Sequence, residues 1–161
     1  MTASSPLKGD AEAFSGALGE LVRVIQFRDR DRACCHDLSV SQCYALKAVA
    51  ESGPITVNEL AAYLYLDKST ASRIANGMVE KGLVQRQRDP DDGRIVQLVA
   101  SETGARVHRR IEDELTQEYA ELLEDFDPAF RSAIVKLIRR LRRSFAARVE
   151  AEGGSCCVVP R

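Results

Sequence analysis

Apolar residues recur at helical spacing in three long stretches of the chain. They fall three or four positions apart, which is typical of amphipathic helices that bury one face. The stripes are longer than the middle of so short a chain can cover, so we expect them to pack against a second subunit. They consist of Phe14, Leu18, Leu21, Val22 and Ile25; of Val107, Ile111, Leu115, Tyr119, Leu122 and Phe126; and of Phe130, Ile134, Leu137, Ile138, Leu141, Phe145 and Val149.

Capping residues mark the shorter helices between these stripes. Ser39 stands three positions before Gln42, and Thr56 stands three positions before Glu59, which is the spacing of a capping box. Asp67 is a favourable N-cap for the helix that follows it.

After these helices, the spacing of the apolar residues changes to one that is typical of β-strands. Residues 83–86 and 95–99 are short β-prone runs, and residues 88–94 between them are polar and rich in turn-forming residues. This order predicts a β-hairpin with a long tip. Asp127 as N-cap and Pro128 at the first helical position open the last helix.

The order of elements predicts a mainly α fold with a small β-hairpin. Residues 57–81 read as a short helix, a tight turn and a second helix, and the hairpin follows at once, as in a winged helix-turn-helix. Polar side chains at a helix N-terminus can hydrogen-bond base edges and phosphates in a major groove, although any soluble helix has a polar outer face. The edge expected to contact DNA consists of Lys68, Ser69, Thr70, Ser72, Arg73 and Asn76.

At this point the chain resembles the MarR family of dimeric bacterial transcription regulators, over roughly residues 11–150. The resemblance is carried by "LDKSTASR" at the start of the second helix, by "EKGLV" with the following "DPDDGR", and by "ETG" at the start of the next helix. Two positions depart from the family pattern. Gly93 stands where many members have a wing arginine, and Ser101 stands where the family usually has threonine, which keeps the cap.

The resemblance implies roles for the hairpin, or wing. Arg94 corresponds to the arginine that enters the minor groove, whose negative potential favours a guanidinium, and Asp92 to the acid that orients it. We expect Arg86 and Arg88 to meet phosphates. The partners implied are double-stranded operator DNA of pseudo-palindromic sequence and a second copy of the chain, and no cofactor is needed for DNA binding.

The same resemblance gives the domain organisation. We expect a flexible N-terminus over residues 1–10 and a single MarR-like domain over residues 11–150, followed by a tail over residues 151–161. Within the domain, residues 39–100 would form the DNA-binding lobe. The dimerisation helices would span residues 11–32 and 101–150.

The distribution of charge along the chain adds an expectation that the net charge does not show. The formal net charge is −1, yet residues 112–127 are strongly acidic and residues 131–148 are basic with no acid. We expect these segments to pair within the protein or its oligomer, on adjoining antiparallel helices, with direct DNA contact of the basic segment as the alternative.

The five cysteines suggest how a signal could be sensed. Cys34 and Cys35 are expected in the connector after the first helix, Cys43 in the second helix, and Cys156 and Cys157 in the tail. Thiolates brought together would suit soft ions such as As(III), Hg(II) or Cu(I), or an oxidant could join them in a disulfide. Either event would release a repressor from its operator. The alternative is structural cysteines, with a small organic ligand in the cleft between the lobes.

Other classes of protein find little support in the sequence. His36 and His108 lie in no nucleophile or metal-hydrolase motif, and a Gly-rich phosphate loop is absent, so we expect no enzyme. A helical protein-interaction module without DNA binding would explain the stripes but not the wing. We find no signal peptide and no stretch long enough for a membrane span, and therefore expect a cytoplasmic protein.

Overall fold

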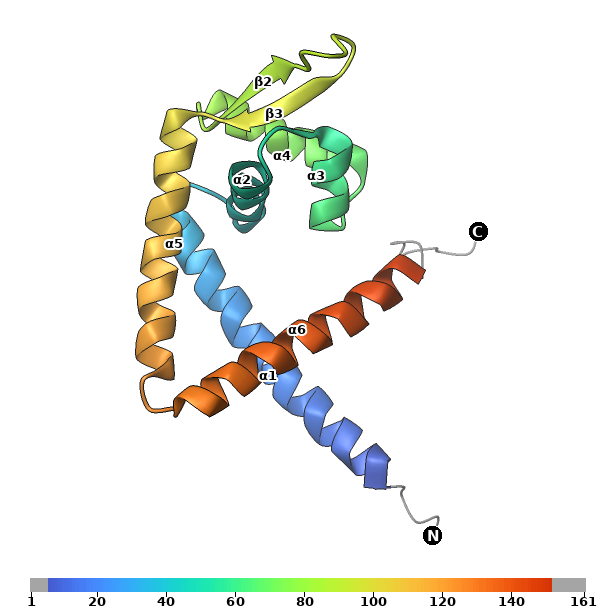
Figure 1. Cartoon of the computed structure of the whole chain (residues 1–161), viewed down its shortest axis with the longest axis vertical. Coiled ribbons are helices and arrows are strands. Elements are labelled where there is room, and N and C mark those ends of the chain that lie inside the picture. Colours follow the sequence, from blue (N-terminus) through green and yellow to red (C-terminus); the bar gives the residue numbers. More distant parts are fainter. Residues whose placement is uncertain (1–5, 152–161) are drawn as a thin grey trace. The chain divides into compact units, whose positions relative to one another are not determined.

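The computed structural model describes residues 6–151, apart from the side chains of residues 32–35 and 150. It confirms the mainly α fold with a small antiparallel sheet (Figure 1). The elements are α1 (Pro6–Cys35), α2 (Val40–Ser52), β1 (Ile55–Thr56), α3 (Val57–Leu64), α4 (Lys68–Glu80), β2 (Val84–Arg88), β3 (Val96–Ala100), α5 (Glu102–Leu123) and α6 (Pro128–Ala151).

The chain forms two compact units, which divide between Tyr44 and Ala45 inside α2. The first unit contains α1, which is longer at both ends than the sequence indicated. It begins at Pro6 rather than near residue 11, because proline is well suited to the first helical position. It continues through Cys35, because no glycine or proline follows Gly19 within it, and the chain turns at Asp37 in a left-handed conformation with φ 54°.

The second unit is held together by a small apolar core beneath α4 and the sheet. Its side chains come from α2, α3, α4 and both strands of the hairpin, so each element contributes its apolar face. Burying one such side chain stabilises the fold by about 1.5–3 kcal/mol. The largest fully buried side chains are Leu46, Val49, Leu60, Met78, Val84 and Leu98.

The hairpin belongs to a three-stranded antiparallel sheet of order β1-β3-β2. Its strands pair from Val84 opposite Ala100 to Arg88 opposite Val96. The sequence did not indicate β1, because two residues are too few to show an alternating pattern. Ile55 of this strand is buried and pairs with Leu98.

The last two helices do not pack side by side as expected. They leave their connecting turn in diverging directions (Figure 1), so the acidic and basic segments do not run alongside each other within the chain. Arg131 instead donates hydrogen bonds to the carbonyl oxygens of Glu124 and Phe126 at the end of α5, at 2.9 and 2.6 Å. A cation at this position suits the negative end of the α5 dipole.

No helix in the described part of the chain is long and apolar enough to cross a membrane.

Candidate nucleic-acid interface

The helix-turn-helix consists of α3, a three-residue turn over residues 65–67 and α4. The capping box predicted at the start of α3 is present, since Thr56 and Glu59 exchange hydrogen bonds between side chain and backbone. Tyr65 ends α3 in a left-handed conformation with φ 53°, and the N–H of Leu66 donates back to the carbonyl oxygen of Ala61 at 2.9 Å. This turn lets α4 start at once.

The burial of α4 follows the predicted division into two faces. Ala71, Ala75 and Met78 are buried against the core. The opposite edge carries every residue that the sequence assigned to DNA contact on this helix, with Thr70 and Ser72 half-buried and Lys68, Ser69, Arg73 and Asn76 exposed.

Asp67, the N-cap of α4, contacts more of this edge than a cap requires. Its Oδ1 accepts hydrogen bonds from the Ser69 hydroxyl at 2.6 Å and the Thr70 N–H at 2.9 Å, and its Oδ2 accepts one from the Thr70 hydroxyl at 2.6 Å. These bonds, led by the one from Ser69, hold the pKa of Asp67 well below its ordinary value. The sequence indicated the cap but not the hydroxyl contacts.

A hydrogen bond joins the wing to α4. Nη2 of Arg86 on β2 donates to Oδ1 of Asn76 at 2.5 Å. Arg86 was expected to meet phosphate and Asn76 a base or phosphate, and the structure brings the two together on one surface. This contact was not foreseen, because ten residues and a turn separate the partners in the sequence.

The tip of the wing is built around Asp89. One of its carboxylate oxygens accepts the backbone N–H groups of Asp91 and Asp92 at 2.8 and 3.0 Å, and the other accepts the Gln97 side-chain amide at 2.8 Å. The Asp89 N–H in turn donates to the carbonyl of Ile95. Asp89 therefore closes the long loop in the way a side chain closes an Asx turn.

Arg88 and Arg94 lie on this exposed wing. Asp92 accepts a hydrogen bond from the backbone N–H of Arg94 at 3.0 Å. Asp92 thus fixes the backbone from which Arg94 projects, whereas the resemblance implied an effect on its side chain. Arg88 donates a longer bond of 3.4 Å to the carbonyl of Gly93.

Among the described side chains, Cys43 is the cysteine whose surroundings can be described. Cys34 and Cys35 are the last two residues of α1, not part of a connector, and their side chains lie outside the described structure, as do Cys156 and Cys157. Cys43 is half-buried, and its burial and the negative charge of Asp29 raise the pKa of its thiol. Within the described residues no three His, Cys, Asp or Glu side chains form a metal-binding group.

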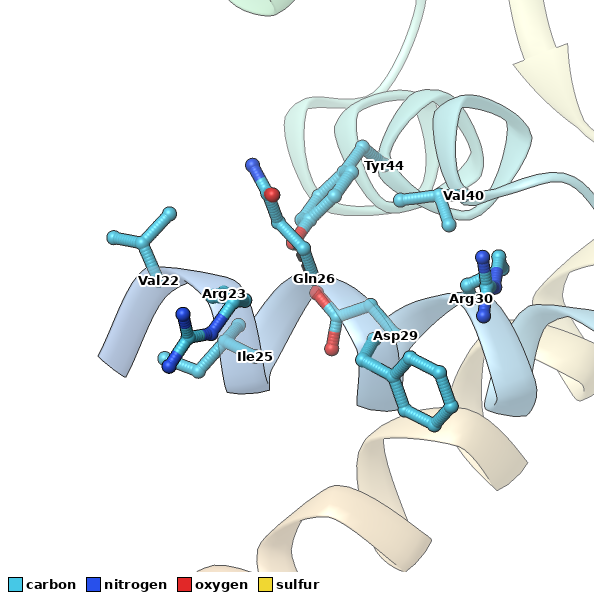
Figure 2. A pocket seen from close by; sticks show the side chains of 9 residues that line it. Val22, Arg23, Ile25, Gln26, Asp29, Arg30, Val40 and Tyr44 are labelled. Carbon is cyan, nitrogen blue, oxygen red and sulfur yellow. Dashed lines mark hydrogen bonds between the residues drawn. The ribbon is translucent and has the colours of Figure 1, made fainter. Parts of the chain in front are cut away.

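An open groove of about 740 Å³ lies in the first unit, between the C-terminal half of α1 and the first turn of α2 (Figure 2). Asp29, one of the lining residues, is held in place, because it accepts hydrogen bonds from Arg28 at 2.8 Å and from the hydroxyl of Tyr44 at 2.6 Å. The lining combines apolar and polar side chains and consists of Val22, Arg23, Ile25, Gln26, Phe27, Asp29, Arg30, Val40 and Tyr44.

Comparison with known proteins shows what this chain resembles in sequence and in fold. The MarR family model matches residues 36–95. The HTH-type transcriptional regulator YxaD of Bacillus subtilis is 27% identical over 128 residues, which cover 80% of this chain and 90% of that relative.

Solved structures agree. A MarR family protein from Bacillus stearothermophilus superposes with a TM-score of 0.77 at 25% identity, covering 88% of this chain and 99% of that one. Streptococcus pneumoniae FabT in complex with DNA shares the fold with a TM-score of 0.76 at 14% identity, covering 84% and 96%. With the helix-turn-helix and the wing, these similarities support a MarR-family winged helix-turn-helix transcriptional regulator; the relatives that the chain matches are transcriptional regulators, not enzymes.

Proposed function

We propose that this protein is a homodimeric repressor that binds a pseudo-palindromic operator and leaves it when a signal arrives. The observation that carries the proposal is the continuous polar surface formed by the exposed edge of α4 and the wing, which Arg86 and Asn76 join. We expect it to act in the cytoplasm, where the operator is accessible.

On this surface α4 occupies the major groove and the wing reaches the adjacent minor groove. Lys68, Ser69, Thr70, Ser72, Arg73 and Asn76 then face the major groove, and Arg86 and Arg88 face the backbone. Arg94 is exposed at the wing and enters the minor groove. The three arginines of the wing are balanced by Asp89, Asp91 and Asp92, so its charge gives only moderate affinity for DNA of any sequence.

Exposed apolar side chains on α1, α5 and α6 support the dimer. Leu122 of α5 is 62% exposed, and Leu137 and Ile138 of α6 are 57% and 59% exposed. On α1, Val24 and Phe27 are 63% and 59% exposed. Side chains of this size on three long helices are typical of a surface that another subunit covers.

Two kinds of effector remain for the signal. The first is a soft ion such as As(III), Hg(II) or Cu(I), or an oxidant, acting on the cysteines. Cys43 contributes poorly to this mechanism, because its raised pKa disfavours the thiolate that binds metals and reacts. Sensing of this kind would therefore depend on Cys34, Cys35, Cys156 and Cys157.

The second kind of effector is a small organic molecule in the groove of the first unit. Apolar side chains beside Arg23, Arg30 and the Tyr44 hydroxyl favour a partly apolar ligand with a polar or anionic group. In this case the cysteines are structural.

Selection from a random duplex library, followed by binding measurements over a range of salt concentrations, tests the proposed DNA binding. We expect sequence-selective binding that weakens with salt, and a site with half-sites about 10 base pairs apart. A helical interaction module without DNA binding would select no sequence. In the same assay, Arg94→Ala should lower the affinity and the salt slope, and Arg73→Ala should relax sequence preference; wild-type isotherms for both would refute these roles.

Sedimentation tests the dimer, and a stable monomer at micromolar concentration would refute it. Replacing all five cysteines by serine tests the effector. If the all-serine protein still leaves the operator with arsenite, mercury, copper and peroxide as the wild type does, the cysteines are not the sensor. Arg30→Ala then tests whether release from the operator depends on an organic ligand bound in the groove.

A further inference from the structure

The polar edge of α4 is organised by hydrogen bonds that start at Asp67. Ser69 and Thr70 both donate their hydroxyl hydrogens to the Asp67 carboxylate, at 2.6 Å each. Nη2 of Arg73, one turn further along α4, donates to the Thr70 hydroxyl oxygen at 3.0 Å. A continuous chain therefore runs from the Asp67 carboxylate through Thr70 to the Arg73 guanidinium.

This chain determines what the hydroxyl groups can offer to DNA. A hydroxyl has one hydrogen to donate and two lone pairs that accept. Because the hydrogens of Ser69 and Thr70 point to Asp67, both groups face outward as acceptors only. Acceptors fit the amino groups of adenine and cytosine in the major groove, and they do not fit phosphate oxygens or the O6 and N7 atoms of guanine.

The chain also restricts Arg73. An exposed arginine samples many rotamers, and ordering it on binding costs free energy. The bond to Thr70 uses one of its five N–H groups and leaves the others available for a base or a phosphate.

Capping alone does not account for aspartate at position 67. Serine, threonine or asparagine would accept the Thr70 N–H equally well. A carboxylate close to the DNA backbone is also electrostatically unfavourable. What aspartate adds is a second oxygen that accepts the Thr70 hydroxyl.

We propose that Asp67 is a positioning residue for sequence discrimination: it holds Ser69 and Thr70 as hydrogen-bond acceptors and, through Thr70, fixes Arg73. The proposal rests on the proposed function, in which α4 reads the major groove. Asp67 acts through its neighbours and need not touch the DNA itself.

Asp67→Asn tests this directly in the full-length protein. Asparagine keeps the cap through its carbonyl oxygen, but its amide donates to Thr70 and so turns the Thr70 hydroxyl outward as a donor. The measured quantity is the ratio of the Kd for an unrelated duplex to the Kd for the selected operator, with thermal unfolding measured in parallel.

We expect Asp67→Asn to lower this ratio about tenfold, as the loss of one good base contact would. Binding of the unrelated duplex should stay the same or tighten, because a negative charge is removed. Thr70→Val should lower the ratio similarly, and the double variant should lose little more, because the two residues act through one chain.

Asp91→Asn is the matched control, since it removes one exposed wing carboxylate outside this chain. It should change both affinities alike and leave the ratio unchanged. An Asp67→Asn ratio equal to that of the wild type or of Asp91→Asn, with unfolding unchanged, would overturn the proposal while leaving the proposed function intact. A wild type without sequence preference would instead overturn the proposed function.

Discussion

The backbone carbonyl of Leu83 lies where a Cβ on Gly104 would be. A Cβ built on this glycine would overlap the Leu83 oxygen and would approach its carbonyl carbon to 2.9 Å and the Leu46 side chain to 3.3 Å. The first turn of α5 can therefore pack against the start of the hairpin only with glycine at this position. This close approach explains the glycine in the "ETG" motif by which the family was recognised.

Gly104→Ala should destabilise the fold markedly, by about 1–3 kcal/mol, because a backbone carbonyl cannot move aside as a flexible side chain can. Urea unfolding monitored by circular dichroism measures the loss. Gly9→Ala on α1, where nothing lies within 4 Å of the added Cβ, should instead leave stability unchanged or raise it by up to about 1 kcal/mol, because alanine favours a helix more than glycine does. Equal effects at the two positions would contradict the packing described.

Ser101 joins the same two elements through its hydroxyl. It donates to the carbonyl oxygen of Gly82 at 2.6 Å and accepts the N–H of Gly104 at 3.0 Å. Ser101→Ala leaves both partners unsatisfied in a nearly buried place, so we expect a loss of about 1–3 kcal/mol in unfolding free energy. Ser101→Thr keeps the hydroxyl and should retain most of the stability; a loss as large as that of alanine would argue against the hydrogen bonds as the cause.

An ion pair between Lys47 on α2 and Glu112 on α5 should give a pH-dependent contribution. Burial lowers the pKa of Lys47, but hydrogen bonds to Glu112 at 2.7 Å and to Glu51 at 3.0 Å outweigh it, and the net shift is upward from 10.5. Because the pKa of Lys47 is higher in the folded protein than in the unfolded chain, the ion pair stabilises the fold fully at pH values below the unfolded-state pKa. This stabilisation is lost as the pH rises through the folded-state pKa.

Lys47→Met should therefore lose less stability than the wild type between neutral pH and pH values above about 10.5. Denaturation at a series of alkaline pH values measures the difference. Glu112→Gln is the control, since it keeps Lys47 but removes the charge that raises its pKa most directly. Parallel alkaline curves for all three proteins would contradict the pairing.

The bond between Arg86 and Asn76 should couple the wing to α4 in DNA binding. Arg86→Ala and Asn76→Ala each remove it, so a double-mutant cycle on operator affinity should give a coupling of about 0.5–3 kcal/mol. Arg88→Ala with Asn76→Ala is the comparison, since Arg88 bonds to Gly93 within the wing. Strictly additive losses in the first cycle would show that the two side chains act separately.

The local elements of this protein follow from short stretches of its sequence. Ser39, Asp67, Ser101 and Asp127 cap helices as predicted, because a cap depends on a side chain and a backbone N–H two or three residues away. The apolar period likewise assigned the two faces of α4, since burial there follows a repeat within one helix.

The contacts between elements depend on how the helices and strands pack in three dimensions. β1 is too short to show a periodic pattern in the sequence. Its pairing with β3 depends on Ile55 meeting Leu98, which lies over 40 residues later in the chain. Arg86 was placed on the wing correctly, yet its bond to Asn76 follows from the angle at which β2 leaves α4. The charge blocks are a similar case within the chain: complementary charge does not fix the direction in which α6 leaves α5, which depends on backbone geometry at the turn and on the packing of each helix.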